Sequence, residues 1–309
     1  MVAALDLGSS AERRGGSSPS IRTKPSLTAG FFVICKIHTF EFLVYSNPLS
    51  PMSFTDPFYL LAITFVAGIN FLFVRSIWRL VYFPKGEARA MDRFYRRHSL
   101  YYNKLDDRLK KRFLQRAYSF TKSLKIIGRI GVEVTQPIKL MVVAAMVQIT
   151  LGYKRYFLKN FRTVFVYPDS FRNPHTGNMH DGEVHPRGLI SFSLKKLLKG
   201  FEDPYDAINL GLHEMAHALM HSILTSSGPQ GSLNATLDDI LTIARLEMEK
   251  INAGEPHVFR SYAGANASEF FAVAVEHFFE NPKGLKSELP TLYSKLCDLL
   301  KQDTALNLF

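Results

Sequence analysis

The spacing of apolar and polar residues divides the chain into segments that predict different elements. Over residues 86–126 charged residues alternate with apolar ones at roughly helical spacing, which predicts helix with one apolar face toward a core. The apolar positions are Phe94, Leu100, Leu105, Leu109, Phe113, Ala117 and Phe120. Residues 138–151 carry Lys139 as their one charged residue and, at 14 residues, suit a buried helix better than a membrane span. Further helices are predicted over 205–224, 234–251 and 267–280.

Two short runs rich in β-branched, apolar and aromatic residues predict strands, at 164–167 and 189–192. A loop that contains several proline and glycine residues separates them. The pattern as a whole therefore predicts an α+β fold that is mostly helical and contains a small sheet.

Residues 58–74 form an apolar run of 17 residues without a charge, and they predict one transmembrane helix. The aromatic residues Tyr59, Trp78 and Tyr82 stand near the ends of the apolar segment, where membrane interfaces favour them. A buried core helix or a pair of strands is the alternative.

The net charge of +11 is a local property of the chain. Residues 75–129 hold 16 basic and 4 acidic residues, net +12, whereas residues 130–309 have a net charge of −2. The positive-inside rule then predicts a single-pass protein of the inner, cytoplasmic membrane, with everything after the span in the cytoplasm. The basic residues form a solvated helix face or contact lipid headgroups, and without a recognisable nucleic-acid fold motif we expect no nucleic-acid partner.

These features predict four regions. Residues 1–51 are a disordered leader or an over-extended start, with Met52 as the alternative first residue. Residues 52–83 form the transmembrane anchor, 84–129 a basic juxtamembrane helical region, and 130–309 the main domain. A hydrophobic content of 47% excludes a disordered chain. Two cysteines are too few for a disulfide scaffold or a Cys-based zinc site.

One motif carries recognisable chemistry: residues 213–217 read His-Glu-Met-Ala-His within a predicted helix. His213 and His217 are four residues apart, so they project from one helix face and can bind one zinc ion. Glu214 can take a proton from a zinc-bound water and act as general base. Two helix histidines without a metal are the alternative.

A catalytic zinc needs a third protein ligand. His221 lies a further turn along the helix, too far along the axis to reach the same ion as His213 and His217. Asn266 is a predicted N-cap, which places Glu269 in the first turn of a helix, as a zinc ligand or as an ordinary acid complementing the helix dipole. Glu276, seven residues on, lies on nearly the same face and can replace Glu269 or orient a ligand histidine.

The surroundings of the motif favour a peptide substrate. We expect the strand at 189–192 to form a sheet edge beside the motif helix, where an extended peptide can add as a further strand. The loop 225–232, rich in serine and glycine, is a plain connector or a lid over the site.

Several blocks of the sequence resemble the Mlc titration factor A family of zinc metallopeptidases, over about residues 95–303. They are 164–171, 182–184, 206–209, 213–217, 262–266, 269–273 and 278–282. The resemblance implies a zincin-type metallopeptidase domain whose core is similar to the protease domain of anthrax lethal factor. It also implies that Glu269 is the third zinc ligand and that Tyr262 stabilises the transition state. A tyrosine that only packs is the alternative for Tyr262.

The resemblance implies a zinc-dependent peptidase or aminopeptidase, with a peptide or protein as substrate and the membrane as a further partner. The rival is a membrane-tethered regulatory protein that binds a transcriptional repressor, with zinc mainly structural, since the soluble family form binds the glucose repressor Mlc. After the motif the family usually continues with Leu-Asp, whereas this chain has Leu219 and Met220.

Overall fold

The computed structural model describes residues 57–81, 83–154, 158, 160–173, 177–225 and 231–306. Residues 62–309 form one compact unit, and residues 1–61 form a second, of which 57–61 are described. The helices are α1 (Pro57–Val81), α2 (Lys85–His98), α3 (Leu100–Lys104), α4 (Asp107–Ser123), α5 (Gln136–Thr150), α6 (Leu194–Glu202), α7 (Leu210–Leu224), α8 (Gly231–Asn252), η1 (Ser261–Gly264), α9 (Ala267–Glu280), α10 (Pro282–Glu288) and α11 (Pro290–Leu300). The strands are β1 (Lys125–Gly128), β2 (Thr163–Tyr167), β3 (Phe171–Arg172), β4 (Met179–His180), β5 (Gly182–His185) and β6 (Leu189–Ser193).

The mostly helical fold with a small sheet is confirmed, but the predicted transmembrane helix is wrong. Within the described ranges, no helix is both long and apolar enough to cross a membrane. The uncharged run inside α1 ends at Arg75 after 17 residues, short of the about 20 that a bilayer core requires. The run also contains the polar Asn70, whose side chain donates a hydrogen bond to the carbonyl of Val66. The predicted single-pass location in the inner membrane, with a cytoplasm-facing domain, is therefore also wrong, because it depended on the transmembrane helix.

The helical pattern over residues 86–126 divides into three helices because two polar side chains compete for backbone N–H groups. Ser99 caps α3 by accepting from the N–H of Tyr102, and Asp106 caps α4 by accepting from the N–H of Leu109. Most of the predicted apolar stripe is nevertheless buried, with Phe94 and Leu100 only partly so. The ring of Phe113 packs edge-on against buried tyrosines of α2 and α3.

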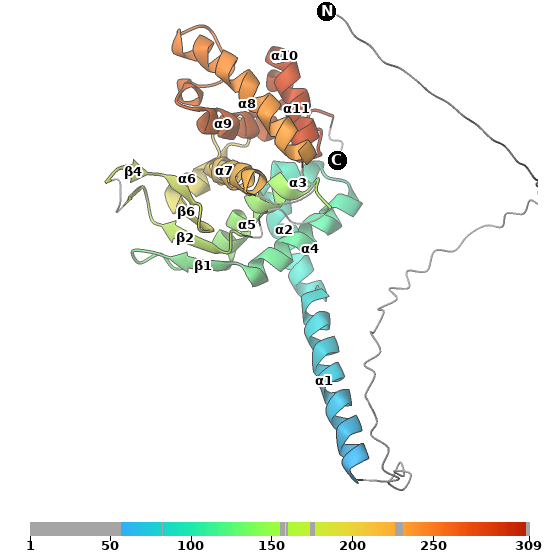
Figure 1. The fold of residues 1–309 in the computed structure, drawn as a ribbon. Helices are drawn as coiled ribbons and strands as arrows, with labels where there is room; N and C mark the ends of the chain where they lie inside the picture. Colours follow the sequence, from blue (N-terminus) through green and yellow to red (C-terminus); the bar gives the residue numbers. More distant parts are fainter. Residues whose placement is uncertain are drawn as a thin grey trace, which may run out of the picture. The chain divides into compact units, whose positions relative to one another are not determined.

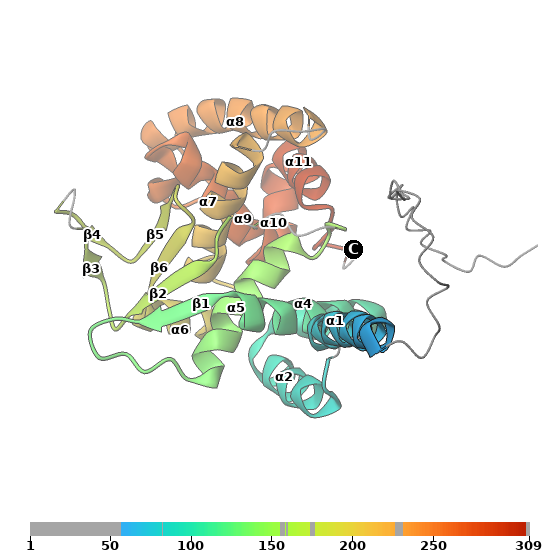
Figure 2. The ribbon, with the colours of Figure 1, turned by 60° about the horizontal axis from the view of Figure 1, so that its bottom comes forward.

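The main sheet has the strand order β1-β2-β6-β5. The first three strands are parallel, and β5 pairs antiparallel with β6, with Gly182 opposite Phe192 (Figure 2). The prediction that residues 189–192 form the edge is therefore wrong, because β6 is enclosed between β2 and β5. The edge nearest α7 is β5, whose short, polar sequence carries little strand signal.

Helix α7 lies at the centre of the fold, packed between α5 on one side and α9 on the other (Figure 1). Both α5 and α7 are buried on nearly all faces, as the apolar character of their sequences requires. The helix predicted to begin at residue 205 begins instead at Leu210, because Asn209 caps it and Ala207 adopts a left-handed φ of +54°. The predicted helices at 234–251 and 267–280 are confirmed as α8 and α9.

Two predicted segments fall mainly where the structure gives no description. The leader 1–51, including Cys35, lies outside the described residues, and so does most of the loop 225–232. Cys297 is a free cysteine on α11.

A buried cation secures the C-terminal end of α5. The guanidinium of Arg116 in α4 donates to the carbonyls of Thr150 (2.5 Å), Leu151 (3.2 Å) and Tyr153. The last carbonyls of a helix have no partner within it, and the helix dipole favours a positive charge there. Arg116 therefore links α4 to the helix that supports α7.

We expect Arg116→Met to reduce the free energy of unfolding by about 3 kcal/mol, because several buried carbonyls lose their donor. Urea denaturation of the purified protein measures the change. The matched control is Arg108→Met, an exposed position on the same helix, for which we expect less than about 0.5 kcal/mol. Equal stabilities of the two variants would show that the Arg116 bonds contribute nothing net.

Candidate metal centre

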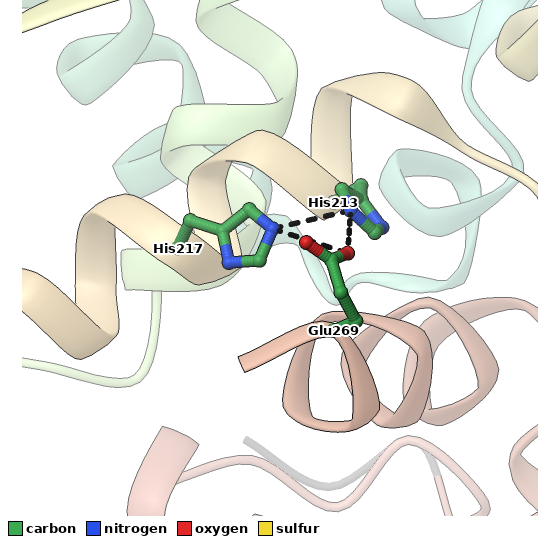
Figure 3. A group of neighbouring side chains, drawn as sticks. All are labelled: His213, His217 and Glu269. Atoms are coloured by element: carbon green, nitrogen blue, oxygen red, sulfur yellow. Dashed lines mark hydrogen bonds and ion pairs between the residues drawn. The ribbon is translucent and has the colours of Figure 1, made fainter. Parts of the chain in front are cut away.

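Three side chains from two helices converge at the centre of the fold. His213 and His217 project from α7, and Glu269 projects toward them from α9 (Figure 3). The Nε2 atom of His213 lies 3.0 Å from Oε2 of Glu269 and 3.2 Å from Nε2 of His217. The distance from His217 Nε2 to Glu269 Oε2 is 3.6 Å. One ligand atom from each residue thus lies within 4.8 Å of the others.

The local sequence explains why these side chains meet. The i, i+4 spacing places both histidines on one face of α7. Asn266 caps α9, and its side chain accepts from the N–H groups of Ser268 and Glu269, as predicted. The cap starts the helix so that Glu269 falls in the first turn, facing α7. The packing of α7 against α9 then brings the carboxylate to the imidazoles.

The donor set and its spacing fit a divalent metal ion. Imidazole nitrogens and carboxylate oxygens bind zinc at about 2.0–2.2 Å, which in a tetrahedral site places ligands about 3.3–3.6 Å apart. The observed separations of 3.0, 3.2 and 3.6 Å are close to these values. His213, His217 and Glu269 could therefore hold such an ion with a modest adjustment.

The protonation of the cluster supports the same conclusion. Burial lowers the pKa of His213, but its hydrogen bonds to Glu269 and Glu276 outweigh burial and raise the pKa to about 10. Burial raises the pKa of Glu269, but both histidines outweigh it and hold that pKa well below its ordinary value. The carboxylates thus attract one positive charge to this point. A metal ion would supply that charge in place of the proton, because a ligating histidine must be neutral.

The second ring nitrogen of each histidine is also held. His213 Nδ1 lies 2.8 Å from Oε1 of Glu276, a nearly fully buried carboxylate, and His217 Nδ1 lies 2.9 Å from Oγ of Ser268. Of the two alternatives for Glu276, the geometry matches the one in which it orients a histidine. Glu276 lies on the far side of the His213 ring from Glu269.

Glu276 is itself fixed by two further donors. Arg260 donates from Nη2 to Oε1 of Glu276 at 2.7 Å, and the backbone N–H of Asn209 donates to Oε2 at 2.7 Å. The other end of the Arg260 guanidinium donates to the carbonyl of Ala207. The loop before α7 is thereby tied to the middle of α9.

Glu214 lies beneath the edge strand β5. A Cβ atom at Gly182 would lie 2.2 Å from Oε1 of Glu214, so only glycine allows the strand to pass this close. Glu214 is 4% exposed, and burial is the main cause that raises its pKa to about 8, with nearby carboxylates adding to the effect and His213 opposing it. The carboxyl group of Glu214 thus lies between β5 and the cluster formed by His213, His217 and Glu269.

Tyr262 lies in η1, just before α9. Its ring centroid is 6.0 Å from that of His213, and the guanidinium carbon of Arg260 lies over the ring, 5.9 Å from its centroid. The side chain is half exposed, and burial together with the charge of Glu269 raises its pKa to about 12. The phenol is therefore a hydrogen-bond donor at neutral pH, beside the cluster.

A cleft lies over these residues and has two halves that share part of their lining. One half has a volume of about 380 Å³ and the other about 460 Å³. Both halves are lined by His180, Gly182, His213, Glu214 and Tyr262. The site is thus open to an extended molecule from two directions.

The structure brings together the five residues singled out from the sequence: His213, Glu214, His217, Tyr262 and Glu269. His221 is not in the cluster; its ring packs edge-on against Phe161 and lines the cleft. The sequence analysis missed the roles of Gly182, Asn209, Ser268 and Arg260. Gly182 and Asn209 each stand in one of the family-like blocks, whereas Arg260 and Ser268 lie outside them.

Comparison with known families agrees with this geometry. Residues 84–301 match the protein family described as glucose-regulated metallo-peptidase M90. The match covers well over half of the chain and includes every residue of the cluster. The resemblance drawn from the sequence blocks is confirmed at the level of the family.

Curated relatives named Mlc titration factor A are similar to about half of the chain. The proteins of Escherichia coli (strain 55989 / EAEC) and Shigella flexneri are each 25% identical over 168 residues, which cover 48% of this chain and 62% of the relative. The protein of Escherichia fergusonii is 25% identical over 173 residues, 49% of this chain and 63% of the relative. The chain thus spans less than two thirds of the length of these relatives.

Asn209 provides a test of how the loop before α7 is held. Its Oδ1 accepts from the N–H of Leu212, and its Nδ2 donates to the carbonyl of Gly200 and to Glu280 at 2.8 Å. We expect Asn209→Ala to lower the free energy of unfolding by about 2–4 kcal/mol, since the cap is lost and the buried Glu280 loses its donor.

Denaturant unfolding of Asn209→Ala beside Asn209→Ser measures this loss. Serine restores the cap but not the Nδ2 bonds, so its stability should fall between alanine and the wild type. If the alanine variant is as stable as the wild type, the side chain of Asn209 does not hold the start of α7.

Proposed function

The chain belongs to the glucose-regulated metallo-peptidase M90 family, and on that premise we propose that it is a zinc-dependent peptidase with Glu214 as general base. The observation that carries the proposal is the convergence of two imidazoles and one carboxylate beside a buried glutamate, at the floor of an open cleft. Two histidines with one carboxylate are a donor set of catalytic zinc sites, which keep one position open.

His213, His217 and Glu269 would hold the metal. When bound, zinc would supply a Lewis acid that acidifies water and polarises a peptide carbonyl. Glu276 and Ser268 orient the two imidazoles through their second nitrogens, which fixes the direction of each ligand lone pair.

Glu214 and Tyr262 carry out the proton transfer and charge stabilisation in this proposal. In its ionised form, which the positive charge of a bound zinc would favour, Glu214 takes a proton from the attacking water and passes it to the leaving amine. The Tyr262 phenol donates a hydrogen bond to the carbonyl oxygen of the peptide as negative charge develops on it. The close approach of Gly182 excludes bulk water from one side of Glu214.

The edge strand β5 would bind the peptide backbone. The N–H of Ser193 donates to the carbonyl of Asp181, which fixes the phase of the ladder between β5 and β6. Since alternate residues of an antiparallel strand bond inward, the backbone groups of Gly182 and Val184 face the open edge. An extended peptide can pair with them and present its backbone above Glu214.

The metal ligands are tested by metal content. We expect the purified wild type to bind about one equivalent of zinc, and His213→Ala, His217→Ala and Glu269→Ala to lose most of it on dialysis. His221→Ala, one turn further on the same helix, is the control that should keep the metal. Full zinc content in any of the three ligand variants would remove that residue from the set. Elemental analysis of dialysed samples measures the result.

The general base is tested by activity. Glu214→Gln should keep the zinc and lose at least about 100-fold in the rate of peptide hydrolysis, because the amide cannot accept the proton. Fluorogenic peptides with and without chelator give the rate, and Glu249→Gln, an exposed position on α8, is the matched control. Activity near that of the wild type in zinc-loaded Glu214→Gln would refute the mechanism.

A second candidate function comes from the name of the relatives. Proteins called Mlc titration factor A are similar to part of this chain, which favours a regulatory protein that binds a transcriptional regulator of the Mlc type. In that case zinc would serve mainly structure. The peptide assay discriminates the two functions: bound metal with no turnover on any peptide supports the regulator.

A further inference from the structure

The two halves of the cleft differ in charge. The half beside α6 is lined by the cationic side chains of Lys196, Lys199 and Arg260, together with apolar Ile208 and Leu210. The residues that line the other half include no lysine or arginine in the part of the chain that the structure describes. That half contains Glu183, Glu214 and Glu269, whereas Asp181, Glu214 and Glu276 line the half that contains the cations. A peptide bound along the cleft would therefore meet cationic side chains at one end only.

The three cations are not equally available. Arg260 is engaged by Glu276 and by the carbonyl of Ala207. Lys196 pairs with Asp181 at 3.2 Å, but both side chains are almost half exposed.

Lys199 is exposed, and none of the described residues offers it a carboxylate partner. Its ammonium is consequently free to meet a ligand, and the exposed ammonium of Lys196 stands on the same helix, three residues earlier.

The direction of β5 determines which end of a peptide meets these lysines. A peptide that continues the antiparallel β5–β6 pattern runs from Val184 toward Gly182. Asp181 precedes Gly182 and lines only the half that contains the lysines, whereas Val184 lines only the other half. Residues after the cleaved bond, which leave with the amine, would then lie beside α6.

We propose that the cleft selects peptides that carry a carboxylate on the C-terminal side of the cleaved bond, recognised by Lys199 with support from Lys196. This inference rests on the proposed peptidase function and names its substrate class. The carboxylate comes from an Asp or Glu side chain, or from the free C-terminus of a short peptide. Both present the same chemistry to an ammonium group.

The test uses internally quenched peptides of one sequence with Asp, Asn or Lys two places after the cleaved bond, all amidated. A fourth peptide ends at that place with a free carboxylate, which distinguishes the two sources of negative charge. Mass spectrometry of the products identifies the cleaved bond. We expect kcat/KM for the Asp peptide to exceed that for the Lys peptide about threefold to tenfold, the scale of two exposed charge pairs, through KM.

Lys199→Glu should abolish or reverse this preference, and Lys111→Glu, an exposed position on α4, should leave it unchanged. High salt should weaken the preference in the wild type, because the lysines are exposed. An equal response to all peptides, or a preference that survives in Lys199→Glu, overturns the proposal. An acidic preference on the N-terminal side of the bond also overturns it, since the peptide would then run the other way.

Binding separates this inference from the proposed function. The affinity of the same peptides for zinc-loaded Glu214→Gln is measured by fluorescence polarisation, without turnover. Tighter binding of the Asp peptide that Lys199→Glu removes supports the carboxylate site even if the wild type cleaves nothing, in which case the peptidase proposal alone fails. If the wild type cleaves the peptides without any charge preference, the peptidase proposal stands and the carboxylate site alone is wrong. If no peptide binds or is cleaved, both proposals are wrong.

Discussion

The rest of the site depends on the hydrogen bonds that hold the buried carboxylate of Glu276. It accepts hydrogen bonds from the loop before α7 and from Arg260, and its Oε1 lies 2.8 Å from Nδ1 of His213. A nearly fully buried carboxylate is costly unless it is satisfied in this way. Because these partners come from separate segments, satisfying the charge fixes the register between α7 and α9. The three cluster residues lie on those two helices, so their spacing follows from this constraint.

The same arrangement positions Glu214 by packing, since no hydrogen bond joins its side chain to another residue in the described part of the chain. It follows His213 on α7, points toward the edge strand, and is covered by the backbone of Gly182. The fold and the site therefore both depend on the buried helix α7, which presents its two histidines to α9 and the carboxyl group of Glu214 to β5. The charged residues at the site are concentrated where a metal ion would balance them, and the wider cleft adds the lysines of α6 at one end.

Sequence reasoning succeeded where the signal was local. The i, i+4 histidines, the Asn266 cap and the buried helix at 138–151 follow from periodicity and capping alone. It failed where tertiary contacts decide: β5 has four residues and no apolar alternation, and Ser99 and Asp106 divide a continuous helical pattern. The transmembrane prediction for residues 58–74 was wrong for a different reason: the run lacks charge, but it is too short to cross a membrane. The position of Glu269 was open between two glutamates until the family resemblance selected it, and similarity to the lethal factor protease domain stays a prediction.

The most direct test is a crystal structure of the zinc-loaded protein with anomalous scattering measured at the zinc absorption edge. The account predicts one strong anomalous peak about 2.0–2.2 Å from the facing atoms of His213, His217 and Glu269, with Glu276 on the opposite nitrogen of His213. A peak at another place, a peak coordinated by Glu276 instead of Glu269, or no peak in a protein that hydrolyses peptides would contradict it.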